Sequence, residues 1–148
     1  MEILKLLSNS KLEAAKYFDL PDDKLKKSYG EGKWSIKEIL VHLADAESVL
    51  LDRIKRVISE PKQVIWAFDQ NLWSAHLDYK NYPLHLSKTV FLANRENIFY
   101  LASKYYDSLG TKEFIHSETG LRTLKDEFGK VEWHCQGHLE QIKIALIL

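Results

Sequence analysis

Apolar residues recur at helical spacing along four long stretches of the chain, and this periodicity constrains the fold more than any other feature. A period of 3.6 residues places one apolar stripe on each helix, and such stripes are buried by packing helices against one another. The strong periodicity is helical throughout, so the sequence predicts an all-α fold. The predicted helices cover residues 2–19, 35–59, 84–108 and 123–147.

The second of these helices has the clearest start. Ser35 and Glu38 fit a capping box, in which each side chain accepts a hydrogen bond from the other residue's backbone N–H. The helix is expected to end at Ser59, because Pro61 cannot continue it. After the third helix, Gly110 stands where a C-terminal cap is expected.

Residues 61–83 form a long connection between the second and third helices. Short loops make neighbouring helices antiparallel, whereas a connection long enough to run back along a helix of about 37 Å permits a parallel crossover. We therefore expect the second and third helices to be parallel and the others antiparallel, in a single domain over residues 1–148. The connection should pack on the bundle because it is rich in aromatic residues. These are Trp66, Phe68, Trp73, Tyr79 and Tyr82.

The composition excludes several classes of protein. Hydrophobic residues make up 45% of the chain and charged residues 28%, which are ordinary values for a globular domain. The 21 basic and 21 acidic residues balance, so no overall field favours nucleic acid. There is no long apolar run for a membrane span and no signal-peptide pattern, so a cytoplasmic protein is expected. Cys135 is the only cysteine, and no internal disulfide can form.

Three histidines fall on the apolar stripes of two predicted helices. His134 and His138 are four residues apart, one turn along the same face, and two imidazoles in this arrangement can hold one metal ion. His42 also lies on an inward stripe. Three protein ligands leave a coordination position open, which is typical of catalytic sites for zinc-like metals. The alternative is that these are ordinary core histidines. Cys135 lies about 100° around the helix from His134 and is not expected to be a ligand.

Two segments then resemble signatures of the DinB-like (YfiT-like) superfamily. Residues 34–47, WSIKEILVHLADAE, resemble its second helix, and residues 123–142, TLKDEFGKVEWHCQGHLEQI, resemble its last helix. The resemblance implies a four-helix bundle in up-down-down-up order and frequent dimerisation. It also implies a site for zinc, nickel or a similar ion, with His42, His134 and His138 as ligands. Further similar positions between the two segments are Asp69, Trp73, Arg95, His116, Glu118 and Gly120.

Arg95 lies on the inward stripe of the third helix, where an unpaired charge is costly. We expect an internal ion pair with Asp69, Asp45 or Glu47, and the alternative is an anchor for an anionic substrate. Before the last helix, His116, Glu118 and Gly120 are expected to fix a loop rather than to act in catalysis. The remaining histidines, His76 and His85, are expected on the surface or in loops.

These observations leave three classes of function open. The first is a metal-dependent enzyme, either a hydrolase of a small molecule or a transferase that uses a low-molecular-weight thiol. The second is a metal-binding bundle without turnover, and the third is a protein-interaction bundle. For an enzyme, Asp45 is the candidate catalytic residue, because it lies three positions beyond His42 and could accept a proton or orient a ligand histidine. The aromatic content also suggests a homodimer, with no nucleic-acid or membrane partner.

Overall fold

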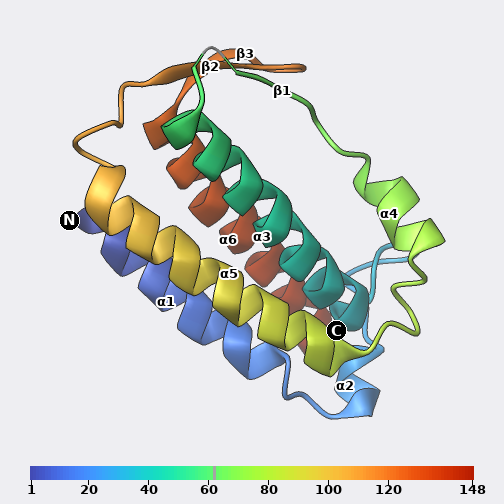
Figure 1. The fold of residues 1–148 in the computed structure, drawn as a ribbon. Coiled ribbons are helices and arrows are strands. Elements are labelled where there is room, and N and C mark those ends of the chain that lie inside the picture. Colours follow the sequence, from blue (N-terminus) through green and yellow to red (C-terminus); the bar gives the residue numbers. More distant parts are fainter. Residues whose placement is uncertain (62) are drawn as a thin grey trace.

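Four long helices form the body of the protein in the computed structural model, which describes residues 1–61 and 63–148 (Figure 1). They are α1 (Glu2–Tyr17), α3 (Ile36–Ser59), α5 (Leu84–Tyr105) and α6 (Leu124–Ile147). Each lies within three residues of its predicted ends. Two short helices, α2 (Asp22–Leu25) and α4 (Gln70–His76), lie in the connections. No helix among the described residues is both long enough and apolar enough to cross a membrane.

The helix ends follow local chemistry. Ser35 and Glu38 make both hydrogen bonds of the predicted capping box, each 3.2 Å long. Thr123 caps α6 in the same way. The cap predicted at Gly110 is wrong, because α5 ends earlier and its cap is Tyr106. A glycine is nevertheless required at position 110, since a Cβ there would lie 2.1 Å from the carbonyl oxygen of Tyr106.

The directions of the long helices follow from their contacts. His42 lies beside His134, and Arg53, further along α3, lies beside the earlier residue Glu127 of α6. The two helices α3 and α6 are therefore antiparallel. Figure 1 shows α3 and α5 side by side and running in one direction, while α1 and α6 run in the other. The connection between α3 and α5 passes along the outside of α3 and carries α4 with it (Figure 1).

A small sheet corrects the all-α expectation. It contains β1 (Val64–Ile65), β2 (Glu113–His116) and β3 (Gly120–Thr123), in the order β1-β2-β3. Strand β1 is parallel to β2, and β2 and β3 form an antiparallel hairpin in which β3 begins at Gly120, at a φ of +79°. Strands of two to four residues are too short for their alternation to stand out against the helical pattern, so the sequence did not predict them.

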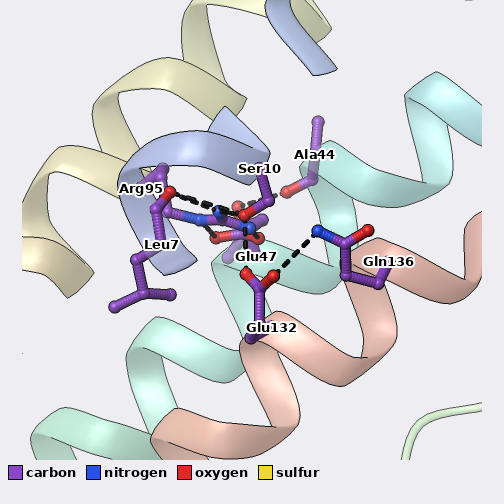
Figure 2. A network of polar contacts seen from close by, with 8 residues as sticks. Leu7, Ser10, Ala44, Glu47, Arg95, Glu132 and Gln136 are labelled. Atoms are coloured by element: carbon purple, nitrogen blue, oxygen red, sulfur yellow. Dashed lines mark hydrogen bonds and ion pairs between the residues drawn. The ribbon is translucent and has the colours of Figure 1, made fainter. Parts of the chain in front are cut away.

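A buried polar network lies between the long helices (Figure 2). Arg95 is 0% exposed and pairs with Glu47 through two nitrogens of its guanidinium group. The guanidinium also donates to the Ser10 hydroxyl at 2.6 Å and to the Leu7 carbonyl at 3.0 Å. Glu47 is thus the partner among the three that the sequence left open. Because Arg95 is enclosed and paired, it is not an anchor for a substrate.

The network continues to α6. Ser10 donates to one carboxylate oxygen of Glu132 at 2.7 Å, and Gln136 donates to the other at 2.8 Å (Figure 2). One polar cluster therefore joins all four long helices and fixes their relative positions along the bundle.

The crossover between α3 and α5 is attached at both ends. At one end the Arg53 guanidinium donates to the carbonyl oxygen of Trp66 at 2.9 Å. At the other end the Tyr79 hydroxyl donates to the Asp45 carboxylate, and the Tyr79 side chain is 1% exposed. The expected packing of the aromatic residues therefore holds for Tyr79, whereas Trp66 is 76% exposed.

Candidate metal centre

Three imidazole rings meet between α3 and α6. His42 comes from α3, and His134 and His138 come from successive turns of α6. The Nε2 atom of His134 lies 2.9 Å from Nε2 of His42 and 3.2 Å from Nε2 of His138. One ligand atom from each of the three histidines lies within 4.8 Å of the other two. The sequence therefore identified three residues that the fold brings together.

Aromatic side chains cover this cluster, which we call the histidine cluster. The Trp34 ring lies 4.9 Å from the ring of His42 and 6.4 Å from that of His138. Phe68 of the crossover stacks on His42 at 6.3 Å, and Trp73 of α4 contacts Phe68 edge-on at 4.9 Å. Apolar cover of this kind excludes water from the ring faces and strengthens electrostatic interactions inside the site.

A neighbouring amide orients one of the rings. The Nδ1 atom of His138 lies 2.7 Å from the side-chain oxygen of Gln141. An amide oxygen only accepts hydrogen bonds, so Nδ1 carries the proton and donates. The lone pair of His138 is therefore on Nε2, the atom that faces the other two rings. His42 Nδ1 is buried and has no hydrogen-bond partner among the described residues.

Burial keeps the three imidazoles neutral. It is the main cause that lowers the pKa of His42 to about 2 and that of His134 to about 3, and the neighbouring histidines lower both further. Burial also lowers the pKa of His138, although its hydrogen bond to Gln141 opposes the shift. Neutral imidazoles are the form that binds metal, so no proton has to be displaced near neutral pH.

The donor set fits a divalent transition metal. Imidazole nitrogens suit zinc, nickel, copper and iron, whereas magnesium and calcium prefer oxygen ligands. Solvent reaches the cluster at the side of His138, where a cavity of about 250 Å³ is lined by His138, Gln141, Trp34 and, from the loops and α4, Tyr29, Gln70 and Asn71.

Comparison with known proteins agrees with this arrangement. A model of the DinB superfamily matches residues 13–142. The chain belongs to the DinB superfamily. The resemblance seen in residues 34–47 and 123–142 is thereby confirmed.

Its relatives in the superfamily include curated bacterial proteins. The chain is 31% identical over 127 residues to a protein of Oceanobacillus iheyensis named "Putative metal-dependent hydrolase", covering 86% of this chain and 73% of that one. It is 25% identical to YfiT of Bacillus subtilis, which has the same descriptive name, over 83% of this chain and 70% of that one.

A solved structure of Bacillus subtilis YfiT has the same fold. It superposes with a TM-score of 0.87 over 96% of this chain and 82% of that chain, at 22% identity. That structure is described as a probable metal-dependent hydrolase with an unusual four-helix bundle topology. The four-helix bundle predicted from the sequence is confirmed at this level.

The candidate catalytic residue, Asp45, lies three positions beyond His42 on α3. Asp45 is half-buried and accepts the hydrogen bond of Tyr79. Among the described residues it has no hydrogen bond to His42, His134 or His138. Burial raises the pKa of Asp45, and the Tyr79 hydroxyl opposes this shift.

Other residues that the sequence singled out have structural roles or surface positions in this DinB bundle. Asp69 caps α4 by accepting hydrogen bonds from two backbone N–H groups. The imidazole Nδ1 of His116 accepts from the backbone N–H of Glu118 at 3.1 Å and thereby holds the β2–β3 turn, as expected. Cys135 is fully buried beside Arg95, away from the histidine cluster. The exposed side chains of His76 and His85 are also as expected.

Two residues of the site were not predicted from the sequence. Gln141 follows His138 by three positions, a spacing at which helical side chains meet, and this spacing could have identified it. Trp34 immediately precedes the cap of α3, and only the fold shows that its ring turns over the histidines.

Proposed function

We propose that this protein is a metal-dependent hydrolase of a small molecule, with His42, His134 and His138 holding a zinc or nickel ion. The observation that carries the proposal is the convergence of one ring nitrogen from each of the three histidines within 4.8 Å. Three protein ligands leave a position free for water or substrate, whereas structural zinc sites use four. Bound there, a divalent metal polarises a carbonyl group and lowers the pKa of water.

The chain's own residues would prepare this site in three ways. Gln141 holds His138 in the tautomer that presents Nε2. Trp34 and Phe68 shield the rings of His42 and His138 from water. The cavity at His138 gives a small molecule a path to the free position. Since the cavity is modest in size, a small substrate is favoured over a polymer.

We keep Asp45 as the candidate proton acceptor. It lies one turn beyond His42 on α3, and its raised pKa moves it toward the range useful for general-base catalysis. Replacing Asp45 by Asn keeps the size of the side chain and removes the base. We expect Asp45→Asn to lower kcat at least tenfold, whereas Tyr79→Phe, which leaves the carboxylate in place, should change it much less. Equal rates for wild type and Asp45→Asn would exclude this role.

The test of the main proposal is a panel of small esters and amides. Each is assayed with zinc, nickel or manganese, in the presence and absence of a low-molecular-weight thiol, on wild type and on His134→Ala. We expect hydrolysis that requires both a metal and His134. A rate that also requires the thiol would assign an S-transferase instead. Equal rates for wild type and His134→Ala on every substrate would leave a metal-binding or interaction bundle without turnover.

Three further expectations belong with this proposal. The directions of the four long helices support an up-down-down-up order for the bundle (Figure 1). We propose a homodimer, which light scattering would contradict by giving the 17.3 kDa mass of one chain. We also propose a cytoplasmic location, without nucleic-acid or membrane partners, on the basis of the composition and the balanced charge of the sequence.

A further inference from the structure

A second cavity lies against α6 and the β2–β3 hairpin. It has a volume of about 510 Å³, and we call it the α6 cavity. Its lining includes three cationic side chains and one carboxylate, in a chain whose formal net charge is zero. The lining residues on which the argument depends are Arg122, Lys125, Asp126, Gly129, Lys130 and Trp133.

Two of these cations, Arg122 and Lys130, have no ion-pair partner among the residues that the structure describes. Lys125 lies 3.8 Å from Asp107 and over the ring of Tyr106, and Asp126 is bonded to the cap residue of its own helix. Arg122 and Lys130 are only partly exposed, and neither forms an ion pair or a hydrogen bond with any residue that the structure describes. A half-buried cation without an acceptor is unusual, because desolvation of its charge is not compensated.

Glu127 and Glu118 attract Lys130, but among the described residues neither carboxylate forms an ion pair with Lys130 or Arg122. The carboxylate of Glu127 is buried and lies 3.7 Å from the guanidinium of Arg53. Glu118, at the hairpin turn, is exposed. The pKa of Lys130 is lowered, first by burial and also by the charges of Arg53 and Arg122, although Glu127 and Glu118 oppose this. An anion bound between Lys130 and Arg122 would compensate for the burial of the Lys130 charge and for the repulsion between the two cations.

Two uncharged residues give the cavity its shape. Trp133 is 74% exposed and offers a flat apolar ring at the edge. Gly129 forms part of the floor, and a Cβ added there would meet no atom within 4 Å. An aromatic ring can therefore lie against Trp133 above the helix backbone, with a charged group directed to Lys130 and Arg122.

The α6 cavity and the proposed metal site both involve residues of α6. Lys130 precedes His134 by four residues, which is one turn or about 6 Å along the same ridge of α6. Its charge helps to lower the pKa of His134, so the two side chains are within electrostatic reach. A lining residue of the α6 cavity therefore lies one helical turn from a proposed metal ligand.

We propose that the α6 cavity binds the oxyanion of an aromatic acid through Lys130 and Arg122, and that the substrate carries such a group. The second half of this statement rests on the proposed function. The first half does not, because it concerns binding to the metal-free protein. In the corresponding reaction water adds to an ester carbonyl of the substrate, the ester C–O bond breaks, and the oxyanion takes no part.

The binding test uses the metal-free protein at low salt. Benzoate and phenyl phosphate are titrated while the indole N–H signal of Trp133 is followed by NMR, with benzamide as the uncharged analogue. We expect both anions to shift this signal and benzamide not to do so. Lys130→Gln and Arg122→Gln should each weaken benzoate at least fivefold, whereas Lys125→Gln, which removes a cation that is already paired, should weaken it less than twofold. Tighter binding of benzoate would identify a carboxylate as the preferred oxyanion, and tighter binding of phenyl phosphate would identify a phosphate.

A pair of glycine variants provides a test that leaves every charge in place. Gly129→Leu should fill the cavity and abolish the shift, while Gly137→Leu, on the same helix outside the lining, should not. Neither added Cβ meets another atom within 4 Å, so both variants should fold, which thermal melting checks. Benzoate binding that is unaffected by Lys130→Gln, Arg122→Gln and Gly129→Leu would overturn the proposal.

The substrate class is tested with the metal bound. Hydrolysis of 4-acetoxybenzoate is compared with that of uncharged phenyl acetate. We expect kcat/KM for the charged ester to exceed that for the neutral one at least tenfold, and Lys130→Gln to remove the difference. Equal values for the two esters would overturn the assignment of the substrate. Absence of any metal-dependent hydrolysis, with benzoate binding intact, would instead contradict the proposed function and the substrate assignment but leave the anion site.

Discussion

The Arg95 network and the histidine cluster both lie inside this bundle, and they differ in how their hydrogen-bonding groups are satisfied. Around Arg95, each charge faces a partner: the guanidinium meets Glu47, and Glu132 accepts from Ser10 and Gln136 (Figure 2). None of the buried side-chain atoms of this network lacks a partner within the described residues. The network is complete without a ligand.

The histidine cluster has the opposite character. Its rings direct three nitrogens at one another, no carboxylate is bonded to them among the described residues, and Nδ1 of His42 has no partner there. Such an arrangement is poor as a structural network and good as a set of metal donors. Burial of polar groups alone therefore does not identify a functional site. What marks it is burial of donors or acceptors that the protein itself leaves without complementary groups.

The largest effect is expected from breaking the Arg95 network. Arg95→Met leaves the Glu47 carboxylate buried without its partner, and loss of one member of a buried pair destabilises a protein by about 3–5 kcal/mol. Urea unfolding of the metal-free protein measures the change. The double variant Arg95→Met/Glu47→Leu should recover most of the loss, because no charge then remains unpaired at this position. A loss below about 1 kcal/mol for Arg95→Met would contradict our view that the network holds the helices together.

The second effect concerns the histidine cluster. Zinc sites with four protein ligands bind with about 10–16 kcal/mol, which is about 2.5–4 kcal/mol for each ligand. His138→Ala should therefore lower metal affinity about 100- to 1,000-fold, as measured by competition with a chelator. Stability of the metal-free protein should change little compared with Arg95→Met. His85→Ala, at an exposed position, is the matched control, and equal losses for the two variants would show that the ligands have been assigned wrongly.

Much of the bundle and of the cluster could be predicted because both depend on helical spacing. The stripe that holds His42 and the interval from His134 to His138 fix which way these side chains point. The capping box at Ser35 fixed the start of α3. These signals are local, so a single sequence carries them.

The remaining features depend on contacts between distant segments. The sheet was missed because β1 pairs with β2 across α4 and α5, and neither strand is long enough to have a pattern of its own. The choice of Glu47 over Asp45 or Asp69 as the partner of Arg95 depends on how α3 and α5 pack. Likewise, Trp34 and Phe68 come to cover His42 only through the folding of two loops.

A smaller effect is expected from the residue that orients His138. Groups that hold a metal ligand from outside contribute about 10- to 100-fold to metal affinity. Gln141→Leu removes the hydrogen bond to Nδ1 of His138 but leaves the three imidazoles in place, so affinity should fall within this range. The same chelator competition measures it. Glu140→Gln alters the exposed neighbour as a control, and an affinity equal to that of wild type for Gln141→Leu would mean that packing alone fixes the ring.

The smallest effect is a pH dependence of the metal-free protein. Burial lowers the pKa of His134 from 6.5 to about 3, so the folded protein leaves this ring neutral where the unfolded chain already binds a proton. The unfolded state is therefore favoured as the pH falls below 6.5, and stability decreases. Between pH 6.5 and 5.5 one such histidine accounts for about 1 kcal/mol. Burial raises the pKa of Glu47 and Asp45, which acts in the opposite direction.

To isolate the histidine, urea midpoints of wild type and His134→Gln are compared at pH 6.5 and 5.5 with chelator present. The carboxyl groups are the same in both proteins and cancel in the difference. We expect wild type to lose about 1 kcal/mol more than the variant over this interval, and His85→Gln to behave as wild type. If His134→Gln loses as much as wild type, His134 is protonated in the folded protein, and the neutral cluster that distinguishes this region from the Arg95 network does not exist in solution.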